Sequence, residues 1–229
     1  MNTYQNLLFD LDGTLTDPAE GITKCIAYAL ESFGIKSPNL DALRPFIGPP
    51  LKETFMDVYG FDEAAALQAA DKYRERFATV GLYENRLFED VPALLEELKG
   101  AGYRLFLATS KPDIFAREIL RHFRLSSFFD FVGGAALDES RPTKAHVIRH
   151  VITEASLVQP EQCIMIGDRK HDVLGAKACS MPSIGVLYGF GNLAELQDAG
   201  ADYIVNDISQ LRTLLLPESS SMRVRNRAW

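Results

Sequence analysis

Cysteine is scarce in this sequence, and its spacing excludes two classes of small, cross-linked protein. The chain has three cysteines, Cys25, Cys163 and Cys179, which are far apart and show no CxxC spacing. A disulfide framework needs an even set of paired cysteines, and a zinc site needs closely spaced ones. We therefore expect three reduced, mostly buried thiols.

Long apolar runs are missing as well. No stretch approaches the roughly 18 consecutive apolar residues that a membrane span needs. The N-terminus also lacks a cationic segment followed by an apolar one, which is the pattern of a secretory signal. We therefore expect no membrane partner and a cytoplasmic location.

Positive charge is in deficit, because 24 Lys and Arg face 31 Asp and Glu, for a formal net charge of -7. The main body has no basic block, so a nucleic-acid backbone is not an expected partner. Hydrophobic residues make up 47% of the chain and charged residues 24%, which is ordinary for a globular protein. A chain of 229 residues is long enough for one large domain, or for one domain that carries an insertion.

The sequence does contain a regular alternation of short apolar runs and amphipathic segments. Amphipathic stretches such as 90–102, 112–123 and 170–179 carry apolar residues three and four positions apart, as helices do. This alternation predicts an α/β fold, with a Rossmann-like parallel sheet covered by helices on both faces. The candidate strands are 4–9, 103–109, 128–134, 162–167, 182–187 and 202–205.

A long gap separates the first two predicted strands. Residues 17–86 contain only helical patterns, so we expect a helical cap subdomain inserted into the core. The core domain would then comprise residues 1–16 and 87–216. Residues 217–229 are polar and Ser-rich with three arginines, and we expect them to form a C-terminal tail.

Polar side chains follow the predicted strands at the points where these strands end. In an open parallel sheet, ligands bind beyond the carboxyl ends of the strands. Separate parts of the chain therefore deliver carboxylates, hydroxyls and ammonium groups to one edge. The residues at these positions are Asp10, Asp12 and Thr14 after the first strand, Thr109, Ser110 and Lys111 after the second, Lys144 after the third, and Asp168 and Asp172 after the fourth.

Several carboxylates at one edge require a balancing charge. Two carboxylates about 4 Å apart repel by roughly 4 kcal/mol at an effective dielectric constant near 20, so Asp10, Asp12 and Asp168 can converge only around a cation or a proton. A ligand set made of oxygens alone favours a hard ion, and Mg²⁺ is our expectation. Such an ion, with Lys144 and Thr109 beside it, suits a phosphoryl group. Gly13 lets the backbone approach the ligand closely.

A carboxylate is the expected nucleophile, because these loops contain no Ser-His or Cys-His pairing. Aspartate is ionised at neutral pH, and aspartyl-phosphate is an established type of covalent intermediate. Asp10 is our candidate. Protonating the leaving group and activating water needs a second carboxyl nearby, and Asp12 fits because residues i and i+2 of an extended chain project to the same side.

Four sequence motifs resemble, in order, the signature motifs of the haloacid dehalogenase-like phosphatase superfamily. They are DLDGT at 10–14, Thr109 at the end of LFLAT, Lys144, and GDRKHD at 167–172. The resemblance extends to about residue 215. The predicted helical insertion and the stretch DLDGTLTDPAEGI are similar to the phosphoglycolate phosphatase and 5'-nucleotidase-like branch.

This resemblance implies a role for each matching residue. Asp10 would be the nucleophile and Asp12 the general acid and base, while Thr109, with Ser110 beside it, and Lys144 would bind the phosphoryl group. Mg²⁺ would be held by Asp10, the backbone carbonyl of Asp12, and Asp168, with Asp172 in support. The implied partner is a small phosphomonoester, and the protein would act as a monomer or a homodimer.

Two other functions share much of this chemistry. A phosphomutase uses the same aspartyl-phosphate and returns the group to its substrate, and a receiver-type switch also has an acidic pocket with Thr and Lys. Asp12 argues against the switch, which does not need a second aspartate. An aspartate after a strand is also a common helix cap, and this reading remains open for Asp17 and Asp172.

The sequence leaves the substrate open between phosphoglycolate, nucleoside monophosphates and phosphorylated sugars. The stretch RPFIGPPLKETF, at 44–55, is the candidate segment for reading the leaving group, because its two prolines form a stiff turn. Arg44 and Lys52 could pair with a substrate carboxylate or a second phosphate, or they could be solvated charges on the cap surface.

Overall fold

The computed structural model describes residues 4–36, 39–138 and 140–216 of the chain. The predicted C-terminal tail at 217–229 lies outside the described residues. Within the described ranges, no helix is both long enough and apolar enough to cross a membrane.

A sheet of six parallel strands forms the centre of the fold, in the order β5-β4-β1-β6-β7-β8. All six predicted strands are present, and their ends differ from the predicted ones by at most three residues. The α/β fold class is therefore confirmed. The strands are β1 (Asn6–Phe9), β4 (Arg104–Pro112), β5 (Phe131–Ala135), β6 (Cys163–Gly167), β7 (Ser183–Val186) and β8 (Tyr203–Val205).

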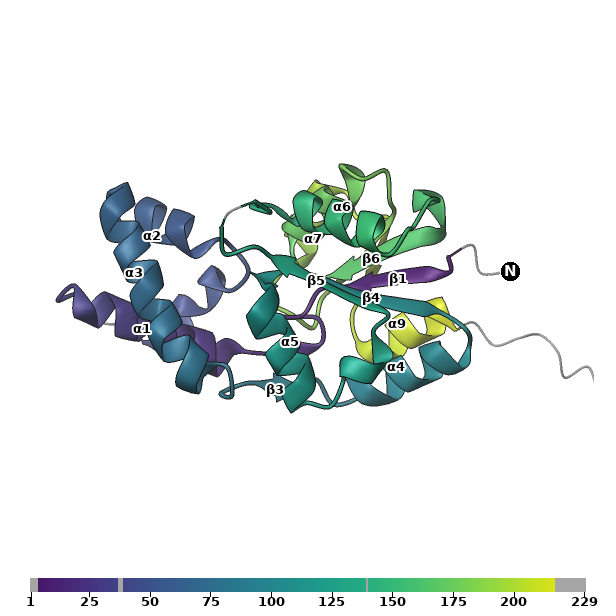
Figure 1. The fold of residues 1–229 in the computed structure, drawn as a ribbon, viewed down its shortest axis with the longest axis horizontal. Coiled ribbons are helices and arrows are strands. Elements are labelled where there is room, and N and C mark those ends of the chain that lie inside the picture. The colour runs from purple at the N-terminus through teal and green to yellow at the C-terminus, as the bar shows by residue number, and fades with distance from the viewer. Residues whose placement is uncertain (1–3, 37–38, 139, 217–229) are drawn as a thin grey trace, which may run out of the picture.

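Helices cover both faces of this sheet, as Figure 1 shows. Alternate residues of β1 point to opposite faces: Leu7 and Phe9 belong to one buried cluster and Leu8 to the other. The first cluster includes residues of α4 (Val91–Gly100), α5 (Asp113–His122) and α9 (Ile208–Leu215), and the second includes residues of α6 (Lys144–Glu154) and α7 (Lys170–Lys177). Such strands, buried on both faces, are continuous apolar runs because both sides need apolar side chains. A further helix, α8 (Leu193–Ala199), packs through Leu196 against Val173 of α7.

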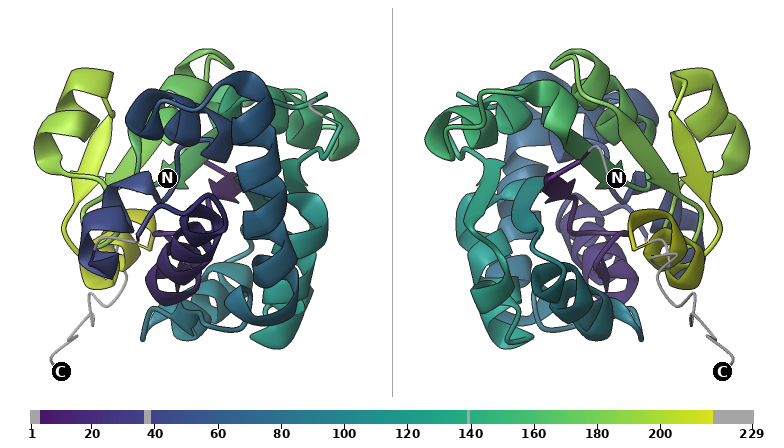
Figure 2. Two further views of the ribbon diagram at one scale, coloured as in Figure 1. Left: turned by 90° about the vertical axis from the view of Figure 1, so that its left-hand side faces the viewer. Right: turned by 90° about the vertical axis from the view of Figure 1, so that its right-hand side faces the viewer.

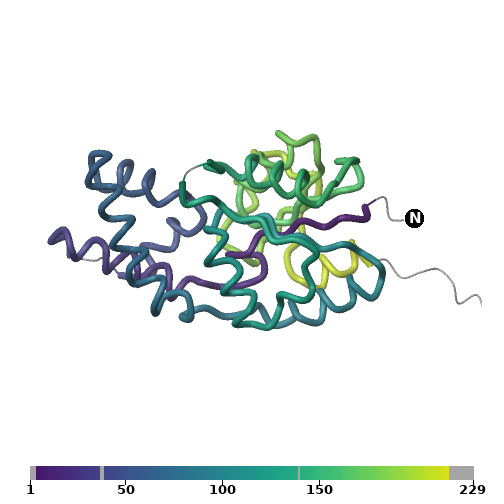
Figure 3. The backbone as a smooth tube through the Cα atoms, in the orientation of Figure 1, coloured from purple at the N-terminus to yellow at the C-terminus, as the bar shows by residue number. Residues whose placement is uncertain are grey.

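A group of helices lies beyond the carboxyl end of the sheet, and we call residues 19–81 the helical insertion (Figures 1 and 2). Its elements are α1 (Ala19–Ser32), the 3₁₀ segment η1 (Leu40–Phe46), α2 (Leu51–Tyr59), α3 (Glu63–Arg76) and the π-helical turn η2 (Phe77–Gly81). Figure 3 shows the chain leaving the sheet and returning to it along neighbouring paths. Two short strands, β2 (Thr16–Asp17) and β3 (Arg86–Leu87), pair antiparallel at that point.

Strand β4 is longer and less regular than its sequence suggested. Its pairing with β5 shifts register between Ala108 and Pro112, so Thr109, Ser110 and Lys111 lie inside the strand instead of after it. The alternation of a strand buries Thr109 and Lys111 and exposes Ser110. An irregular strand end of this kind changes the direction of side chains, and here Lys111 pairs with Asp12, which follows the neighbouring strand β1.

Candidate active site

Strand β1 lies at the centre of the sheet; the chain runs from β1 outward to β4 and β5 and then returns to β6, on the other side of β1. A crevice outside the carboxyl ends at such a switch point is the expected ligand site of an open α/β sheet. Asp10 follows β1 directly, Asp168 follows β6, and Lys144 is the first residue of α6. The helical insertion lies beyond this same edge, as Figure 1 shows.

The buried ammonium group of Lys144 holds three parts of the site together. Its Nζ lies 2.9 Å from Asp10 Oδ1 and 2.7 Å from Asp172 Oδ1, and it donates a hydrogen bond of 3.0 Å to the carbonyl of Ala108. Burial alone would lower the pKa of Lys144, but the charges of Asp10 and Asp172 outweigh burial and raise it. Lys144 is therefore a fixed positive charge, with its three N–H donors directed at three acceptors.

Three buried carboxylates converge beside Lys144. Asp10, Asp168 and Asp172 each present a carboxylate oxygen, and these oxygens lie within 4.8 Å of one another. Asp168 is completely buried; its Oδ2 accepts a 2.7 Å hydrogen bond from the Phe190 N–H, while its Oδ1 has no hydrogen-bond partner among the described residues. An orphaned oxygen in a buried acidic cluster is the arrangement that a hard cation would complete.

The pKa shifts of this cluster also indicate that its negative charge is not balanced. Burial raises the pKa of Asp168 well above its usual range, and the charges of Asp172 and Asp10 raise it further. Burial also raises the pKa of Asp172 to about 6; the charge of Asp10 adds to this rise, and Lys144 opposes it. The carboxylates thus carry more negative charge than Lys144 balances, so the cluster favours an additional cation or a proton.

Gly13 is required at its position because a side chain there would collide with Asp168. Its φ is +82°, and a Cβ atom would lie 2.1 Å from Asp168 Oδ2. No ordinary Cβ contact is that short, and the backbone conformation itself disfavours L side chains. The close approach at Gly13 in the structure is to the carboxylate of Asp168, whereas the sequence-based expectation concerned a ligand.

We expect Gly13→Ala to lower the free energy of unfolding by more than about 2 kcal/mol, because the collision with Asp168 adds to the roughly 1–2 kcal/mol cost of a left-handed alanine. Gly102→Ala is the matched control, since Gly102 has a φ of +91° and a Cβ there would meet nothing within 4 Å. Urea denaturation of both variants measures the two losses. Equal losses would show that the approach to Asp168 carries no cost.

Asp12 lies outside this cluster of three and pairs with a second lysine. Lys111 Nζ lies 2.8 Å from Asp12 Oδ2, and the two side chains are only 5% and 14% exposed. The Asp12 Oδ1 atom is buried and has no hydrogen-bond partner among the described residues. Burial raises the pKa of Asp12, although Lys111 opposes the rise. Asp10 and Asp12 therefore occupy different surroundings, one beside Lys144 and the other beside Lys111.

The other predicted phosphate-binding residues are divided between the interior and the surface. Thr109 is buried, and its Oγ1 accepts a 3.2 Å hydrogen bond from the Lys111 N–H, whereas Ser110 is exposed.

Asp172 also accepts a 3.1 Å hydrogen bond from the Arg169 N–H at the start of α7, so it caps a helix as well as belonging to the acidic cluster. Asp17, which lies two residues before α1, likewise accepts a 3.0 Å hydrogen bond from the Ala19 N–H.

Arg169 connects the acidic cluster to the helical insertion. Its Nε donates a 2.9 Å hydrogen bond to Glu195 Oε1, and its Nη1 donates to the carbonyl of Ile47 in the insertion. Nearby, the Arg44 guanidinium lies 5.5 Å from the ring centroid of Phe190, the residue whose N–H binds Asp168. The segment around Arg44 thus contacts the loop that contains Phe190, whose backbone N–H donates a hydrogen bond to Asp168.

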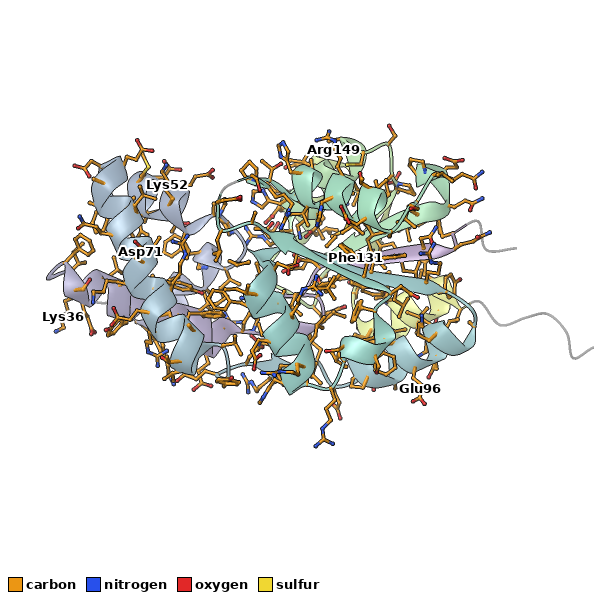
Figure 4. All side chains as sticks on the ribbon, in the orientation of Figure 1. Lys36, Lys52, Asp71, Glu96, Phe131 and Arg149 are labelled. Carbon is orange, nitrogen blue, oxygen red and sulfur yellow. The ribbon has the colours of Figure 1, made fainter. Side chains whose placement is uncertain are left out.

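Lys52, the other cap residue considered for substrate binding, has a surface partner instead. Its Nζ lies 2.6 Å from Glu63 Oε1, a carboxylate that is 71% exposed. Figure 4 shows Lys52 on α2, away from the sheet. Of the two cap residues, Arg44 therefore lies nearer the acidic cluster.

The sequence pointed to most of these residues but missed two roles. Lys111 was placed at the correct edge without a partner, and Arg169 was part of the GDRKHD motif without a role of its own. The alternation of buried residues along β4 would have been the signal for Lys111, because it puts Lys111 on the same side as Thr109. No sequence signal connects Arg169 with Ile47, which is 122 residues away.

Comparisons with known proteins identify similar sequences over most of the chain. A family profile described as "Haloacid dehalogenase-like hydrolase" matches residues 7–186. The chain is 51% identical to a "5'-nucleotidase" of Pseudomonas aeruginosa, over 93% of this chain and 96% of the relative. It is 38% identical to "Tyrosine-protein kinase PtkA" of Mycobacterium tuberculosis, over 92% of this chain and 72% of the relative. It is 29% identical to a "Phosphoglycolate phosphatase" of Colwellia psychrerythraea, over 90% of this chain and 94% of the relative.

A solved structure extends the likeness to three dimensions. The crystal structure of a predicted phosphatase from Clostridium acetobutylicum superposes with a TM-score of 0.90 at 48% identity, and covers 93% of this chain and 98% of that chain. Both the sheet and the helical insertion thus have counterparts in a solved protein.

Proposed function

Because the chain is an enzyme of the haloacid dehalogenase-like hydrolase family, we propose that it is a Mg²⁺-dependent phosphomonoester hydrolase that works through an aspartyl-phosphate. The observation that carries this proposal is the convergence of Asp10, Asp168 and Asp172 around one point beside the buried cation Lys144. Buried carboxylates at the carboxyl ends of parallel strands match the demands of phosphoryl transfer, which depends on positioning and on neutralising charge.

The charge balance of the site supports a divalent ion. Four aspartates meet two lysines here, so the ionised site has two negative charges in excess. One Mg²⁺ would neutralise that excess, and its ligands would be Asp10 and Asp168, with the Asp12 carbonyl as the resemblance implies and Asp172 in support. When bound, the ion would supply positive charge to the oxygens of the phosphoryl group.

Asp10 is the proposed nucleophile. Its Oδ1 accepts a 2.7 Å hydrogen bond from the Leu11 N–H and lies 2.9 Å from Lys144 Nζ, so two donors fix the orientation of the carboxylate. In the first step, a carboxylate oxygen of Asp10 forms a bond to phosphorus, and the bond from phosphorus to the leaving oxygen breaks. Thr109 would donate a hydrogen bond to a phosphoryl oxygen, and the positive charge of Lys144 would attract these oxygens, with Ser110 at the rim of the site.

Asp12 is the proposed acid and base. Burial favours its protonated form, which suits a group that gives a proton to the leaving oxygen. In the second step Asp12 takes a proton from water, the water oxygen attacks phosphorus, and the bond to Asp10 breaks to release phosphate. The contrast between Asp10 beside Lys144 and Asp12 beside Lys111 supports this division of labour.

The helical insertion supports a small substrate. It lies over the carboxyl edge of the sheet and rests on the loop around Phe190 through Arg44 and Arg169. A cover of this kind excludes water from the reacting group. Phosphoglycolate and nucleoside monophosphates are the proposed substrate types, in line with the names of two of the similar proteins.

Steady release of inorganic phosphate from p-nitrophenyl phosphate in the presence of Mg²⁺ tests the proposed reaction. We expect continuous turnover without any added cofactor except the ion. A single stoichiometric labelling that then stops would favour a receiver-type switch, and turnover that depends on an added sugar bisphosphate would favour a phosphomutase. A panel of phosphomonoesters ranked by kcat/KM would then identify the leaving group.

A further inference from the structure

Lys111 is a buried cation to which the proposed reaction gives no task. Its side chain is 5% exposed, and its ammonium group lies 2.8 Å from Asp12 Oδ2 and 4.3 Å from the centroid of the Phe77 ring. An ammonium group has three N–H donors. Among the described residues, the carboxylate and the ring face are its only partners, so at least one donor is left for a further acceptor.

The Phe77 ring that contacts Lys111 belongs to an aromatic cluster of the helical insertion and α5. Phe77 begins η2, its ring stacks on Tyr73 at 5.4 Å, and it meets Phe115 edge-on at 5.3 Å. Lys111 therefore lies between the acid of the core and an aromatic wall of the insertion. A cation over an aromatic face is held firmly without losing its capacity to donate hydrogen bonds.

If the proposed function is correct, the leaving group of the substrate must lie beside Asp12 and Lys111. Asp12 is the group that would protonate the leaving oxygen, so that oxygen must come within hydrogen-bond reach of the Asp12 carboxyl. Asp12 Oδ1 is buried and unpartnered within the described part of the chain. The atoms next to the leaving oxygen then lie close to the unused donor of Lys111, because Lys111 contacts the other oxygen of the same carboxyl.

We propose that Lys111 determines specificity by donating a hydrogen bond to an oxygen on the carbon next to the one that bears the phosphate ester. This inference rests on the proposed function and deepens it. Both proposed substrate types carry such an oxygen: a carboxylate in phosphoglycolate and a ribose oxygen in a nucleoside 5'-monophosphate. A buried donor left without an acceptor is costly, so a leaving group that lacks the oxygen is disfavoured.

Three small substrates of similar size separate the contributions. Ethyl phosphate has no such oxygen, 2-hydroxyethyl phosphate has a hydroxyl, and phosphoglycolate has a carboxylate. In the wild type we expect kcat/KM to be at least about tenfold higher for the two oxygen-bearing substrates than for ethyl phosphate, as the loss of a hydrogen bond to a charged group would give. This comparison needs no variant, so it stands even where a variant fails to fold.

In Lys111→Met we expect kcat/KM to fall about 10- to 100-fold more for the oxygen-bearing substrates than for ethyl phosphate. Lys111→Gln keeps a donor without the charge, and we expect it to retain more activity on 2-hydroxyethyl phosphate than on phosphoglycolate. Lys99→Met is the matched control, because it breaks a 2.9 Å ion pair with Asp130 outside the site. We expect it to leave all three rates unchanged.

The outcomes distinguish this inference from the proposed function. If Lys111→Met lowers kcat/KM by the same factor on all three substrates, Lys111 only orients Asp12 and the specificity role is wrong. A wild type without preference among the three would overturn the role as well. If the wild type hydrolyses none of these esters and not p-nitrophenyl phosphate either, the proposed function fails and the inference fails with it.

Discussion

Asp10→Asn is expected to give a folded protein with less than about one hundredth of the wild-type phosphatase activity, because an amide does not attack phosphorus as a carboxylate does. The substitution keeps the shape of the side chain and one oxygen. That oxygen can still accept the hydrogen bond of the Leu11 N–H and contact Lys144 Nζ. The substitution also removes one negative charge from the crowded cluster with Asp168 and Asp172, so we expect no loss of thermal stability.

Asp17→Asn is the matched control for this variant. Asp17 is close in sequence and also accepts a backbone hydrogen bond, but its partner is the Ala19 N–H at the start of α1. We expect it to retain activity. Phosphate release and thermal unfolding are measured for both variants to test the role of Asp10. Activity of Asp10→Asn above a hundredth of the wild type would contradict the assignment of Asp10 as the nucleophile.

Chelation by EDTA is expected to reduce activity to the background rate, and added Mg²⁺ to restore it. The physical reason is the excess negative charge of the site, where three carboxylate oxygens within 4.8 Å of one another lie beside one buried lysine, Lys144. Without the ion, the phosphoryl group would meet unbalanced carboxylates and be repelled. EDTA that has been saturated with Mg²⁺ is the control for effects of the chelator itself.

A second measurement tests the metal site without activity. An ion that binds only the folded protein raises its unfolding temperature. We expect Mg²⁺ to raise this temperature in the wild type and to have a much smaller effect on Asp168→Asn, since Asp168 Oδ1 has no partner among the described residues. Activity that is indifferent to chelation, or equal stabilisation of both proteins, would refute the metal site.

The fold could be predicted from the sequence because its signals are local. A strand buried on both faces must be a short apolar run, and a helix packed on it must carry apolar residues three and four apart. Each of these patterns lies within ten or so residues, so each of the six strands was found. The end of β4 was misjudged because its extension to Pro112 depends on pairing with Ala135 of another strand.

The candidate site could be predicted only as a set of residues at one edge. Asp10, Asp168 and Lys144 were expected there because each follows a strand or starts the next helix, and the structure brings them together. The ion-pair partners in the site could not be predicted from the sequence. The sequence did not predict that Asp12 pairs with Lys111, or that Asp172 contacts Lys144.

The sequence by itself determined the parallel α/β architecture and the edge at which charged groups collect, and it predicted that a cation or a proton balances the carboxylates there. These follow from apolar periodicity and from the charge that each strand end carries. Only the tertiary structure decided which carboxylate pairs with which lysine, that Phe77 backs Lys111, and that Arg169 reaches Ile47. Those contacts join residues far apart in the chain, and their geometry depends on how the helical insertion packs on the sheet, which no local pattern encodes.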